Sequence, residues 1–377
     1  MFNLERIEEI IQDIFRTEFV RLRKDTFAFF DDTPLPPLKQ IPLEISKQAA
    51  LKAGVFFGFA PKDFSSLRQL AQQALNAWQK NRFIYLATSG STGEPKQILY
   101  TAEMMEIEAR CIGKHFKVAK RFITLTPRQH LYGITFAVFF PYVYNIPAFA
   151  LPPIPLSPWD KLLKEGDSVA GFPLFWEYFL KAGNKFPKGI TAITSTAPCP
   201  KGLFERLKQA GAETVAELYG ATETGGIGVR FSEQEPFTIN DYWDISTEQN
   251  PPLISRKGIE GWIDFPDEVR FLPPRGMFPL KRLDRAVQVA GVNVYPQAVE
   301  KVINKHPAVQ ECKVRLMRPE EGRRLKAFIV LKAGYTPKEL PAIKAYLAGA
   351  LSSHEMPRSF TFGPHLPVNS MGKSADW

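Results

Sequence analysis

The chain has 377 residues, and its hydrophobic content of 45% and charged content of 23% are those of a folded protein with a sizeable core. Two or three domains fit this length. The net charge is +9, and residues 285–377 hold 14 Lys or Arg against 7 Asp or Glu. No zinc-finger or RNP pattern accompanies this surplus. We therefore interpret it as a solvated basic face or as a surface for an acidic small molecule or protein, and expect no nucleic acid partner.

Targeting and membrane segments are not expected. Residues 4–11 are too acidic for an export signal. The longest apolar run, 134–151, is interrupted by Pro141, Asn145 and Pro147, so it predicts a buried helix followed by a buried strand rather than a membrane span. The three cysteines and five histidines form no disulfide framework or metal-binding cluster. We expect a cytoplasmic protein that does not contact a membrane.

The first 90 residues predict a helical region that leads into a strand. The N-terminal helix is expected to bury one apolar face, made of Ile7, Ile10, Ile11, Ile14 and Phe15. A proline-rich connector, 32–42, follows. Asp63 is expected to cap a second helix, whose apolar residues recur at helical spacing from Leu67 to Trp78. Residues 83–87 then predict a strand.

Strand and helix patterns alternate over the next 130 residues, which predicts an α/β domain with buried sheets. The expected strands are 97–100, 121–125, 146–151, 168–171, 190–195 and 214–218. The expected helices lie at 102–115, after His130, from Pro173 and from Pro200.

The pattern changes in the second half of the chain. Residues 240–274 are rich in Pro, Trp and acidic residues and predict short irregular strands. After the charged segment 281–285 comes a smaller αβ unit, with strands or strand pairs in 287–294, 309–317 and 326–331 and helices in 296–305 and 337–352. We therefore predict a large N-terminal domain, residues 1–283, and a small C-terminal domain, residues 284–377.

Residues 83–96 are the most informative stretch. An apolar run releases a loop of hydroxyl side chains and two glycines that ends at Lys96. Such a loop of N–H and O–H donors suits phosphate. It is not a Walker A loop, because Pro95 stands where a glycine is needed and Gln97 follows the lysine. The alternative is an ordinary surface turn, since turns use the same residue types.

Three further segments carry candidate chemistry. His130 directly follows a strand, where α/β sheets place ligand sites, although a single histidine is more often structural. Residues 217–226 place a carboxylate, hydroxyls and glycines on a second loop at the same sheet edge, and a carboxylate there could hold the Mg²⁺ of a nucleotide or cap a helix. Lys373 follows a glycine in a tail whose Pro and Gly residues suggest a held loop rather than a solvated end.

Together these segments resemble the adenylate-forming superfamily, which includes acyl- and aryl-CoA ligases, peptide-synthetase adenylation domains and luciferases. The motifs occur in the family's order and cover about residues 80–377. They are the phosphate-binding loop at 88–96, the adenine segment at 195–198, the Tyr-Gly-x-Thr-Glu signature at 219–223, the ribose segment at 261–267, the hinge motif at 282–291 and the catalytic-lysine motif at 367–373. Gln288 departs from the pattern, because the family usually has a lysine there.

The resemblance implies a layered α/β fold with a reduced N-terminal layer and a mobile C-terminal lid. It also implies roles for single residues. The catalytic ones would be Lys373, Thr222 and Glu223, with Glu223 also on the metal. The ATP contacts would be Thr88, Ser89, Gly90, Ser91, Thr92, Gly93, Lys96, Ser195, Thr196, Ala197, Pro198, Tyr219, Gly220, Asp267 and Arg282. The acyl pocket would hold His130, Tyr132, Gly133 and Gly225, the hinge would be Asp284, and Gly291 would line the thiol tunnel.

The implied function is an AMP-forming acid–thiol ligase that uses ATP and Mg²⁺. It would form an acyl-adenylate and pass the acyl group to CoA or to the phosphopantetheine of a carrier protein. In its compactness the chain resembles the stand-alone ligases of bacterial aryl-polyene and anthraquinone polyketide clusters. Aromatic residues around His130 and Trp176 favour an aryl or polyketide-type acid as the substrate. The alternative is a non-catalytic scaffold built on a reduced adenylation fold.

Overall fold

The computed structural model describes residues 2–22, 35–88, 96–116, 119–151, 159–248, 251–257, 260–265, 267–282, 286–289, 292–318, 320–322, 324–367 and 377. They divide into two compact units. The larger comprises the described residues of 1–88 and 97–283, and the smaller comprises Lys96 and those of 284–377. In neither unit does any described helix combine the length and the hydrophobicity needed to cross a membrane.

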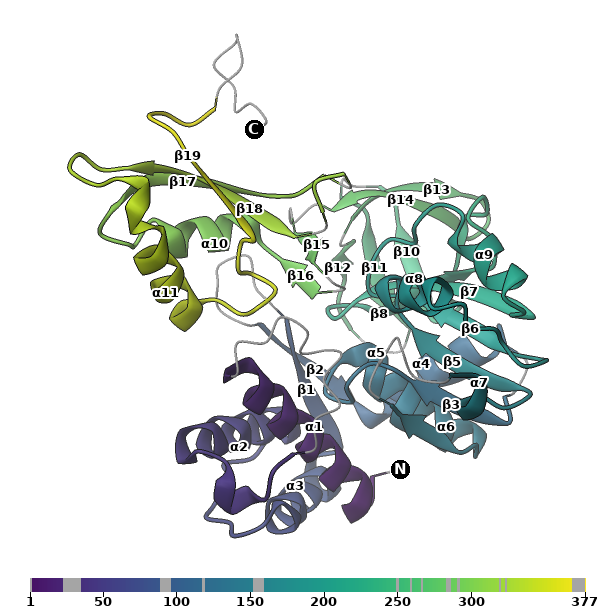
Figure 1. Ribbon diagram of the computed structural model, residues 1–377. Coiled ribbons are helices and arrows are strands. Elements are labelled where there is room, and N and C mark those ends of the chain that lie inside the picture. Colours follow the sequence, from purple (N-terminus) through teal and green to yellow (C-terminus); the bar gives the residue numbers. More distant parts are fainter. Residues whose placement is uncertain are drawn as a thin grey trace. The chain divides into compact units, whose positions relative to one another are not determined.

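The larger unit begins with three helices that lie side by side, α1 (Leu4–Leu22), α2 (Leu43–Phe57) and α3 (Leu67–Asn81) (Figure 1). The predicted apolar face of α1 is buried. The predicted cap of α3 was wrong. Ser66 caps this helix, because its side chain accepts the backbone N–H of Gln69, and the helix begins one residue later, at Leu67.

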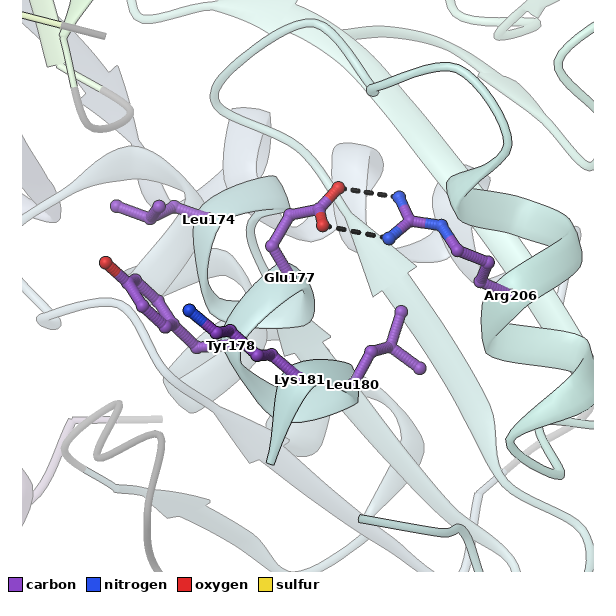
Figure 2. A pocket seen from close by; sticks show the side chains of 6 residues that line it. All are labelled: Leu174, Glu177, Tyr178, Leu180, Lys181 and Arg206. Carbon is purple, nitrogen blue, oxygen red and sulfur yellow. Dashed lines mark hydrogen bonds and ion pairs between the residues drawn. The ribbon is translucent and has the colours of Figure 1, made fainter. Parts of the chain in front are cut away.

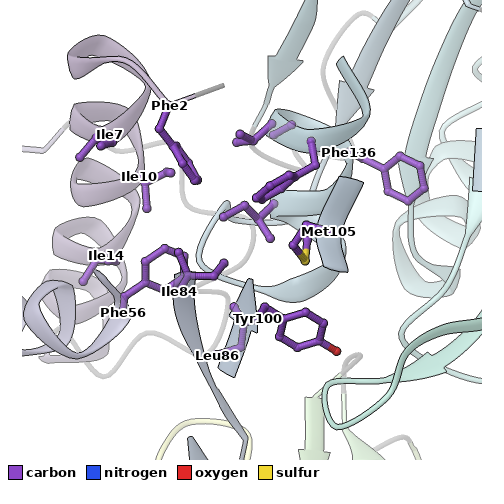
Figure 3. Close-up of a cluster of buried hydrophobic side chains, with 14 of the residues drawn as sticks. Phe2, Ile7, Ile10, Ile14, Phe56, Ile84, Leu86, Tyr100, Met105 and Phe136 are labelled. Carbon is purple, nitrogen blue, oxygen red and sulfur yellow. The ribbon is translucent and has the colours of Figure 1, made fainter. Parts of the chain in front are cut away.

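One hydrophobic cluster joins these helices to the rest of the larger unit (Figure 3). Phe2 and Ile10 pack with Ile84 of β1 (Phe83–Thr88) and with Tyr100 of β2 (Lys96–Thr101). α4 (Ala102–Gly113) follows β2 directly and adds Met105 to the same cluster. α1 is thus part of the main core rather than an appendage.

A mixed sheet forms the centre of the larger unit, and among the described residues it contains nine strands. The parallel half has the order β4–β3–β5–β6–β7, made of β3 (Arg121–Thr124), β4 (Ala148–Ala150), β5 (Asp167–Gly171), β6 (Thr191–Thr194) and β7 (Thr214–Ala221). The antiparallel half continues with β8 (Gly225–Arg230), β9 (Phe237–Ile239), β14 (Gly276–Arg282) and β13 (Asp267–Leu272). The carboxyl ends of the parallel strands meet at one edge, where a site is expected.

The helix after His130 is continuous from residue 131 to 144 but changes its winding. α5 (Leu131–Ile134) runs into a π-helical turn, η3 (Thr135–Phe139), and then into α6 (Phe140–Tyr144). Within it, the backbone N–H of Phe140 donates to the carbonyl of Thr135, five residues back. Pro141 follows at once and has no N–H to donate. The wider turn accommodates this proline inside a buried helix.

The remaining elements of the larger unit cover or extend the sheet. The helices α8 (Pro173–Lys181) and α9 (Leu203–Gln209) pack on the parallel half, and α7 (Trp159–Leu162) contributes Trp159 to the same cluster. A separate antiparallel sheet consists of β10 (Trp243–Ser246), β11 (Leu253–Arg256) and β12 (Ile263–Asp264). A short 3₁₀ helix, η2 (Leu38–Gln40), precedes α2.

The smaller unit has its own core. Its elements are β15 (Val287–Val289), β16 (Val292–Val294), α10 (Pro296–Ile303), β17 (Val309–Leu316), β18 (Leu325–Leu331), η4 (Pro337–Glu339), α11 (Leu340–Ala350) and β19 (Ser359–Phe362). β19 was not predicted and pairs in parallel with β18. The backbone oxygen of Trp377 accepts hydrogen bonds from Arg315 and Lys326, each at 2.6 Å. The predicted class, a layered α/β unit followed by a small second unit, is confirmed.

Candidate active site

The turn between β7 and β8 carries two of the predicted catalytic residues. Thr222 is half-buried and Glu223 is exposed, so both can be reached from solvent. The prediction of a loop over 217–226 was wrong at both ends, because β7 extends to Ala221 and β8 begins at Gly225. A bulge after Tyr219 brings the two backbones so close that a Cβ on Gly220 would lie 2.1 Å from the carbonyl oxygen of Gly225. The motif glycine is therefore required by this narrow hairpin.

Tyr219 and Asp267 form a hydrogen-bonded pair beside this turn. The Tyr219 hydroxyl donates to Oδ2 of Asp267 at 2.7 Å, and its ring lies nearly parallel to that of Phe265. Asp267 is only 6% exposed. Arg282 stands directly opposite Asp267 in the β13–β14 register. The two residues predicted to hold a ribose are thus cross-strand neighbours.

The segment after β6 lies against the end of β7. Ser195 donates through Oγ to the carbonyl of Leu218 at 2.8 Å, and Thr196 adopts a left-handed conformation with φ of 74°. This conformation is strained for a β-branched residue. Ala197 and Pro198 continue the same segment, half-buried and exposed respectively. The adenine segment is thereby brought next to the strand that carries Tyr219.

His130 begins the helix that follows β3, at the same sheet edge. The hydroxyl of Tyr132 and the indole N–H of Trp176 both donate to the carbonyl of Ile193, at 3.4 and 3.3 Å. His130 itself is exposed. Protein nevertheless surrounds it closely enough that desolvation lowers the pKa of its imidazole, while the Asp13 carboxylate acts in the opposite direction. The His130 ring is therefore partly enclosed by protein, although it keeps contact with solvent.

Comparison with known proteins assigns the family. A sequence profile for AMP-binding enzymes matches residues 33–250, more than half of the chain. The chain belongs to the AMP-binding enzyme family. A second profile, for the AMP-binding enzyme C-terminal domain, matches residues 298–373. These matches confirm the resemblance to the adenylate-forming superfamily.

Relatives of this AMP-binding enzyme include ligases for aromatic acids. A 4-coumarate–CoA ligase of Cereibacter sphaeroides is 32% identical over 79% of this chain and 71% of its own. A 3,4-dihydroxybenzoate–[aryl-carrier protein] ligase of Bacillus anthracis is 24% identical over 94% of this chain and 85% of its own. The chain is accordingly an AMP-forming acid–thiol ligase that works through an acyl-adenylate.

Solved structures agree on the fold. The o-succinylbenzoate CoA synthetase of Bacillus subtilis superposes with a TM-score of 0.63 at 20% identity, over 77% of this chain and 67% of that one. The amide bond synthetase McbA of Marinactinospora thermotolerans gives a TM-score of 0.64 at 17% identity, with the same coverage. The AMP-binding enzyme thus has the adenylate-forming fold.

The described side chains of the AMP-binding enzyme fit a nucleotide bound with a divalent cation. Asp267 is a buried carboxylate, which can accept hydrogen bonds from ribose hydroxyls. Thr222 offers a hydroxyl, and Glu223 offers an exposed carboxylate of the kind that Mg²⁺ binds. Lys96 is exposed at the start of β2, where the predicted phosphate loop ends. These groups match the chemistry of the family's cofactors.

Several predicted residues of this AMP-binding enzyme lie outside the described residues. They are Ser89, Gly90, Ser91, Thr92, Gly93, Asp284, Gly291 and Lys373. For Thr88 and Arg282 the structure describes the backbone, in β1 and β14. The roles assigned to all ten remain predictions.

A group of buried side chains that was not predicted from the sequence supports the 222–226 turn. The guanidinium of Arg256 donates to the carbonyl of Thr224 at 2.6 Å, and the Tyr100 hydroxyl donates to that of Thr222 at 2.9 Å. Glu108 accepts the backbone N–H of Gly226 at 3.1 Å and lies 3.6 Å from Arg256. We call Arg256, Glu108 and Tyr100 the interior brace.

The interior brace is almost completely shielded from water. The side chains of Arg256 and Glu108 are 5% and 3% exposed, and the guanidinium lies within 5.5 Å of the ring centres of Tyr100, Tyr242 and Trp243. Desolvation raises the pKa of Glu108, whereas Arg256 and the Gly226 N–H oppose that rise. One sequence signal could have found the brace: Glu108 stands among the core positions of α4, such as Met105, Ala109 and Ile112.

Close packing explains why two residues of the predicted acyl pocket are glycines. Gly225 has φ of 86°, and a Cβ there would lie 2.3 Å from Oε2 of Glu108. A Cβ on Gly133 would lie 2.1 Å from the carbonyl oxygen of Pro127. Both glycines thus allow close contacts inside the fold. Their direct contact with a substrate remains a prediction.

A surface cavity of about 420 Å³ lies apart from these predicted residues (Figure 2). Leu174, Tyr178 and Lys181 line it, together with Leu180 and the ion pair between Glu177 and Arg206. Glu177 and Arg206 neutralise each other in a bidentate contact, and Lys181 is a further charged side chain in the lining. We assign no role in the reaction to it.

Proposed function

We propose that the chain activates an aromatic carboxylic acid with ATP and transfers the acyl group to a phosphopantetheine thiol. In the first step a carboxylate oxygen attacks the α-phosphorus, and pyrophosphate leaves. In the second step the thiol attacks the acyl carbon, and AMP leaves with the pair of electrons of the broken C–O bond. The observation that carries this proposal is a shared sheet edge: the 222–224 turn, the Ser195 segment and the His130 segment follow the parallel strands β7, β6 and β3. The Tyr219–Asp267 pair lies beside the turn.

The nucleotide would be held by several segments. Glu223 would share Mg²⁺ with phosphate oxygens, since described residues offer no cluster of three or more metal-binding side chains. The bound ion offsets phosphate charge. Thr222 would donate to the α-phosphate, and Asp267 with Arg282 would hold the ribose. By resemblance, Ser89, Gly90, Ser91, Thr92 and Gly93 would bind the outer phosphates, and Lys373 would bridge the carboxylate and the α-phosphate.

An aromatic acid is the substrate class best supported. Tyr132, two residues after His130, shares the Ile193 carbonyl with the buried Trp176. Relatives named for 4-coumarate, 3,4-dihydroxybenzoate and 2-succinylbenzoate point to the same class. Flat aromatic acids gain from contact with such rings.

For the acceptor we favour a carrier protein over free CoA. The basic surplus of residues 285–377 suits an acidic carrier surface, and Gln288 replaces a lysine that the family usually has. One of the relatives is named for an aryl-carrier protein, although others are named for CoA. Rapid thioester formation with micromolar CoA, unchanged by an added cognate carrier protein, would overturn this preference.

Pyrophosphate exchange into ATP with a panel of aryl and aliphatic acids tests the first step. We expect exchange with aryl acids, and expect Glu223→Gln to lower its rate by about tenfold or more because a metal-facing carboxylate is lost. Glu213→Gln is the matched control, since Glu213 is also exposed but lies at the opposite end of β7. Exchange with no acid at all would instead support the alternative, a non-catalytic scaffold.

The proposal also assigns the two steps to different residues of the C-terminal part. Lys373→Ala should depress pyrophosphate exchange by ~10²-fold, since it removes a transition-state contact, and should still convert supplied acyl-adenylate. Asp284→Pro fixes φ at the proposed hinge, so it should spare exchange and depress thioester formation. Equal losses of both steps in both variants would contradict a lid that serves each step in a different pose.

A further inference from the structure

α1 lies outside the part of the chain that the family profile matches, which begins at residue 33. Its apolar face is buried in the main core, as Figure 3 shows for Ile7, Ile10 and Ile14. A polar stripe of the same helix, spaced at 6, 9, 13 and 17, contacts the segment 127–137 that carries His130. These contacts give α1 more than a packing role.

Asp13 makes the central contact of this stripe. Its Oδ2 accepts the backbone N–H of Arg128 at 3.0 Å and the Arg128 guanidinium at 2.9 Å. Both side chains are only 12% exposed, and Glu9 adds a second carboxylate 3.3 Å from Arg128. One carboxylate oxygen therefore fixes both the backbone and the side chain of the residue two positions before His130.

Two further contacts hold the same segment on either side. The amide of Gln129 donates to the Thr17 hydroxyl at 2.7 Å. Beyond His130, the Arg6 guanidinium donates to the carbonyl of Ala137. Ala137 is four residues before Pro141, which has no N–H for that carbonyl, so Arg6 satisfies an acceptor that the proline leaves open. α1 thus contacts both the loop before His130 and the helix after it.

We propose that α1 is a positioning element of the acid-binding recess, acting through Asp13, Thr17 and Arg6 on the 127–137 segment. This inference rests on the proposed function, in which His130 and Tyr132 face the acid. α1 supplies the support for this side of the acid-binding recess. The part of the site proposed to bind the nucleotide is held by other residues, namely the interior brace and the Tyr219–Asp267 pair.

This separation predicts which kinetic constant changes. Loosening 127–137 displaces groups that contact the acid, and small displacements of positioning groups have large kinetic effects. We expect Asp13→Asn to raise the KM for the acid in pyrophosphate exchange by on the order of tenfold, with the KM for ATP unchanged. Arg6→Met should act in the same direction.

Glu8→Gln is the matched control. Glu8 lies on the same helix and pairs with Arg68 of α3 at 3.1 Å, away from the His130 segment. The chemical change is equivalent, but the KM for the acid should stay at the wild-type value. An Asp13→Asn enzyme whose KM for the acid equals that of Glu8→Gln, or whose KM rises equally for acid and ATP, would overturn the proposal.

Hydrogen exchange provides a readout that needs no turnover. The amide of Arg128 donates to Asp13, so Asp13→Asn should speed exchange at residues 128–133 while the amides of the 222–226 turn keep their wild-type protection. Unchanged protection at 128–133 would overturn the inference even if the enzyme were active. If the wild-type chain activated no acid, the proposed function would fail, and the exchange result would still decide whether α1 holds this segment.

Discussion

Two supports in the larger unit differ in their contact with water. The interior brace holds the 222–226 turn. The side chains of its ion pair, Arg256 and Glu108, are 5% and 3% exposed. α1 holds the 127–137 segment through Asp13 and Arg128, each 12% exposed, and through Glu9, which is 45% exposed. Both supports use a guanidinium, a carboxylate and backbone groups. The difference lies in the dielectric environment.

That difference determines what each support can do. A buried pair has already lost its hydration, so removing one partner leaves an uncompensated charge. A pair in partial contact with water is screened in part by water and salt, so its loss costs less free energy. The interior brace is therefore coupled to the stability of the fold, whereas the α1 contacts can change the shape of a binding recess with little effect on stability.

The largest expected effect is that of Arg256→Met. This variant leaves Glu108 buried without its partner and removes the donor to the Thr224 carbonyl, so the free energy of unfolding should fall by about 3–5 kcal/mol. Urea unfolding followed by fluorescence measures it. The double variant Arg256→Met with Glu108→Met is the control, and it should recover much of the loss because no charge remains buried. A single-variant loss below about 1 kcal/mol would show that the pair is not dry.

Tyr100→Phe should have an intermediate effect. The hydroxyl donates to the Thr222 carbonyl at 2.9 Å, and its removal leaves that acceptor without this donor while the ring stays in place. We expect the free energy of unfolding to fall by about 1–2 kcal/mol. Pyrophosphate exchange should slow in the same variant, since Thr222 carries a proposed catalytic hydroxyl. Wild-type exchange at reduced stability would separate the brace from the chemistry.

Salt should distinguish the two supports. Asp13→Asn is expected to cost less than about 1 kcal/mol of unfolding free energy at low salt, and that difference should shrink toward zero as salt is raised to about 0.5 M. The cost of Arg256→Met should be the same in both conditions, because ions do not reach the buried pair. Unfolding curves at two salt concentrations provide the comparison. If the unfolding free energy lost in Arg256→Met depended on salt, the interior brace would not be shielded from ions.

The smallest expected effect concerns His130. Desolvation holds its pKa below the ordinary value, and Asp13 partly opposes this. Asp13→Asn removes the opposing carboxylate, so the pKa of His130 should fall further. Because the folded state disfavours the cation, stability should fall as the pH drops below about 6.5. An NMR titration of the histidine C2 protons measures the shift, and Glu8→Gln should leave it unchanged.

The sequence predicted the parallel half of the sheet well, because buried parallel strands such as β5 and β6 read as short apolar runs between helices. It predicted the residues of the 222–224 turn through a motif. It did not predict that β7 continues to Ala221 or that the sheet continues into β8, β9 and β14. The glycine-rich β8 lacks an alternating pattern, and β9 has only three residues. It also missed Arg256, whose partners Glu108 and Tyr100 are about 150 residues away along the chain.

The π-helical turn at Thr135–Phe139 has a consequence for how this chain can vary. Such a turn is equivalent to a single residue inserted into an α-helix. Deleting one residue there would return the segment before Pro141 to ordinary winding, in which the proline ring clashes with the carbonyl four residues earlier. The flanking α5 and α6 would keep nearly the same orientation, because the wide turn absorbs the extra residue. The length of this turn is therefore tied to Pro141, and loss of that proline would make the extra residue dispensable.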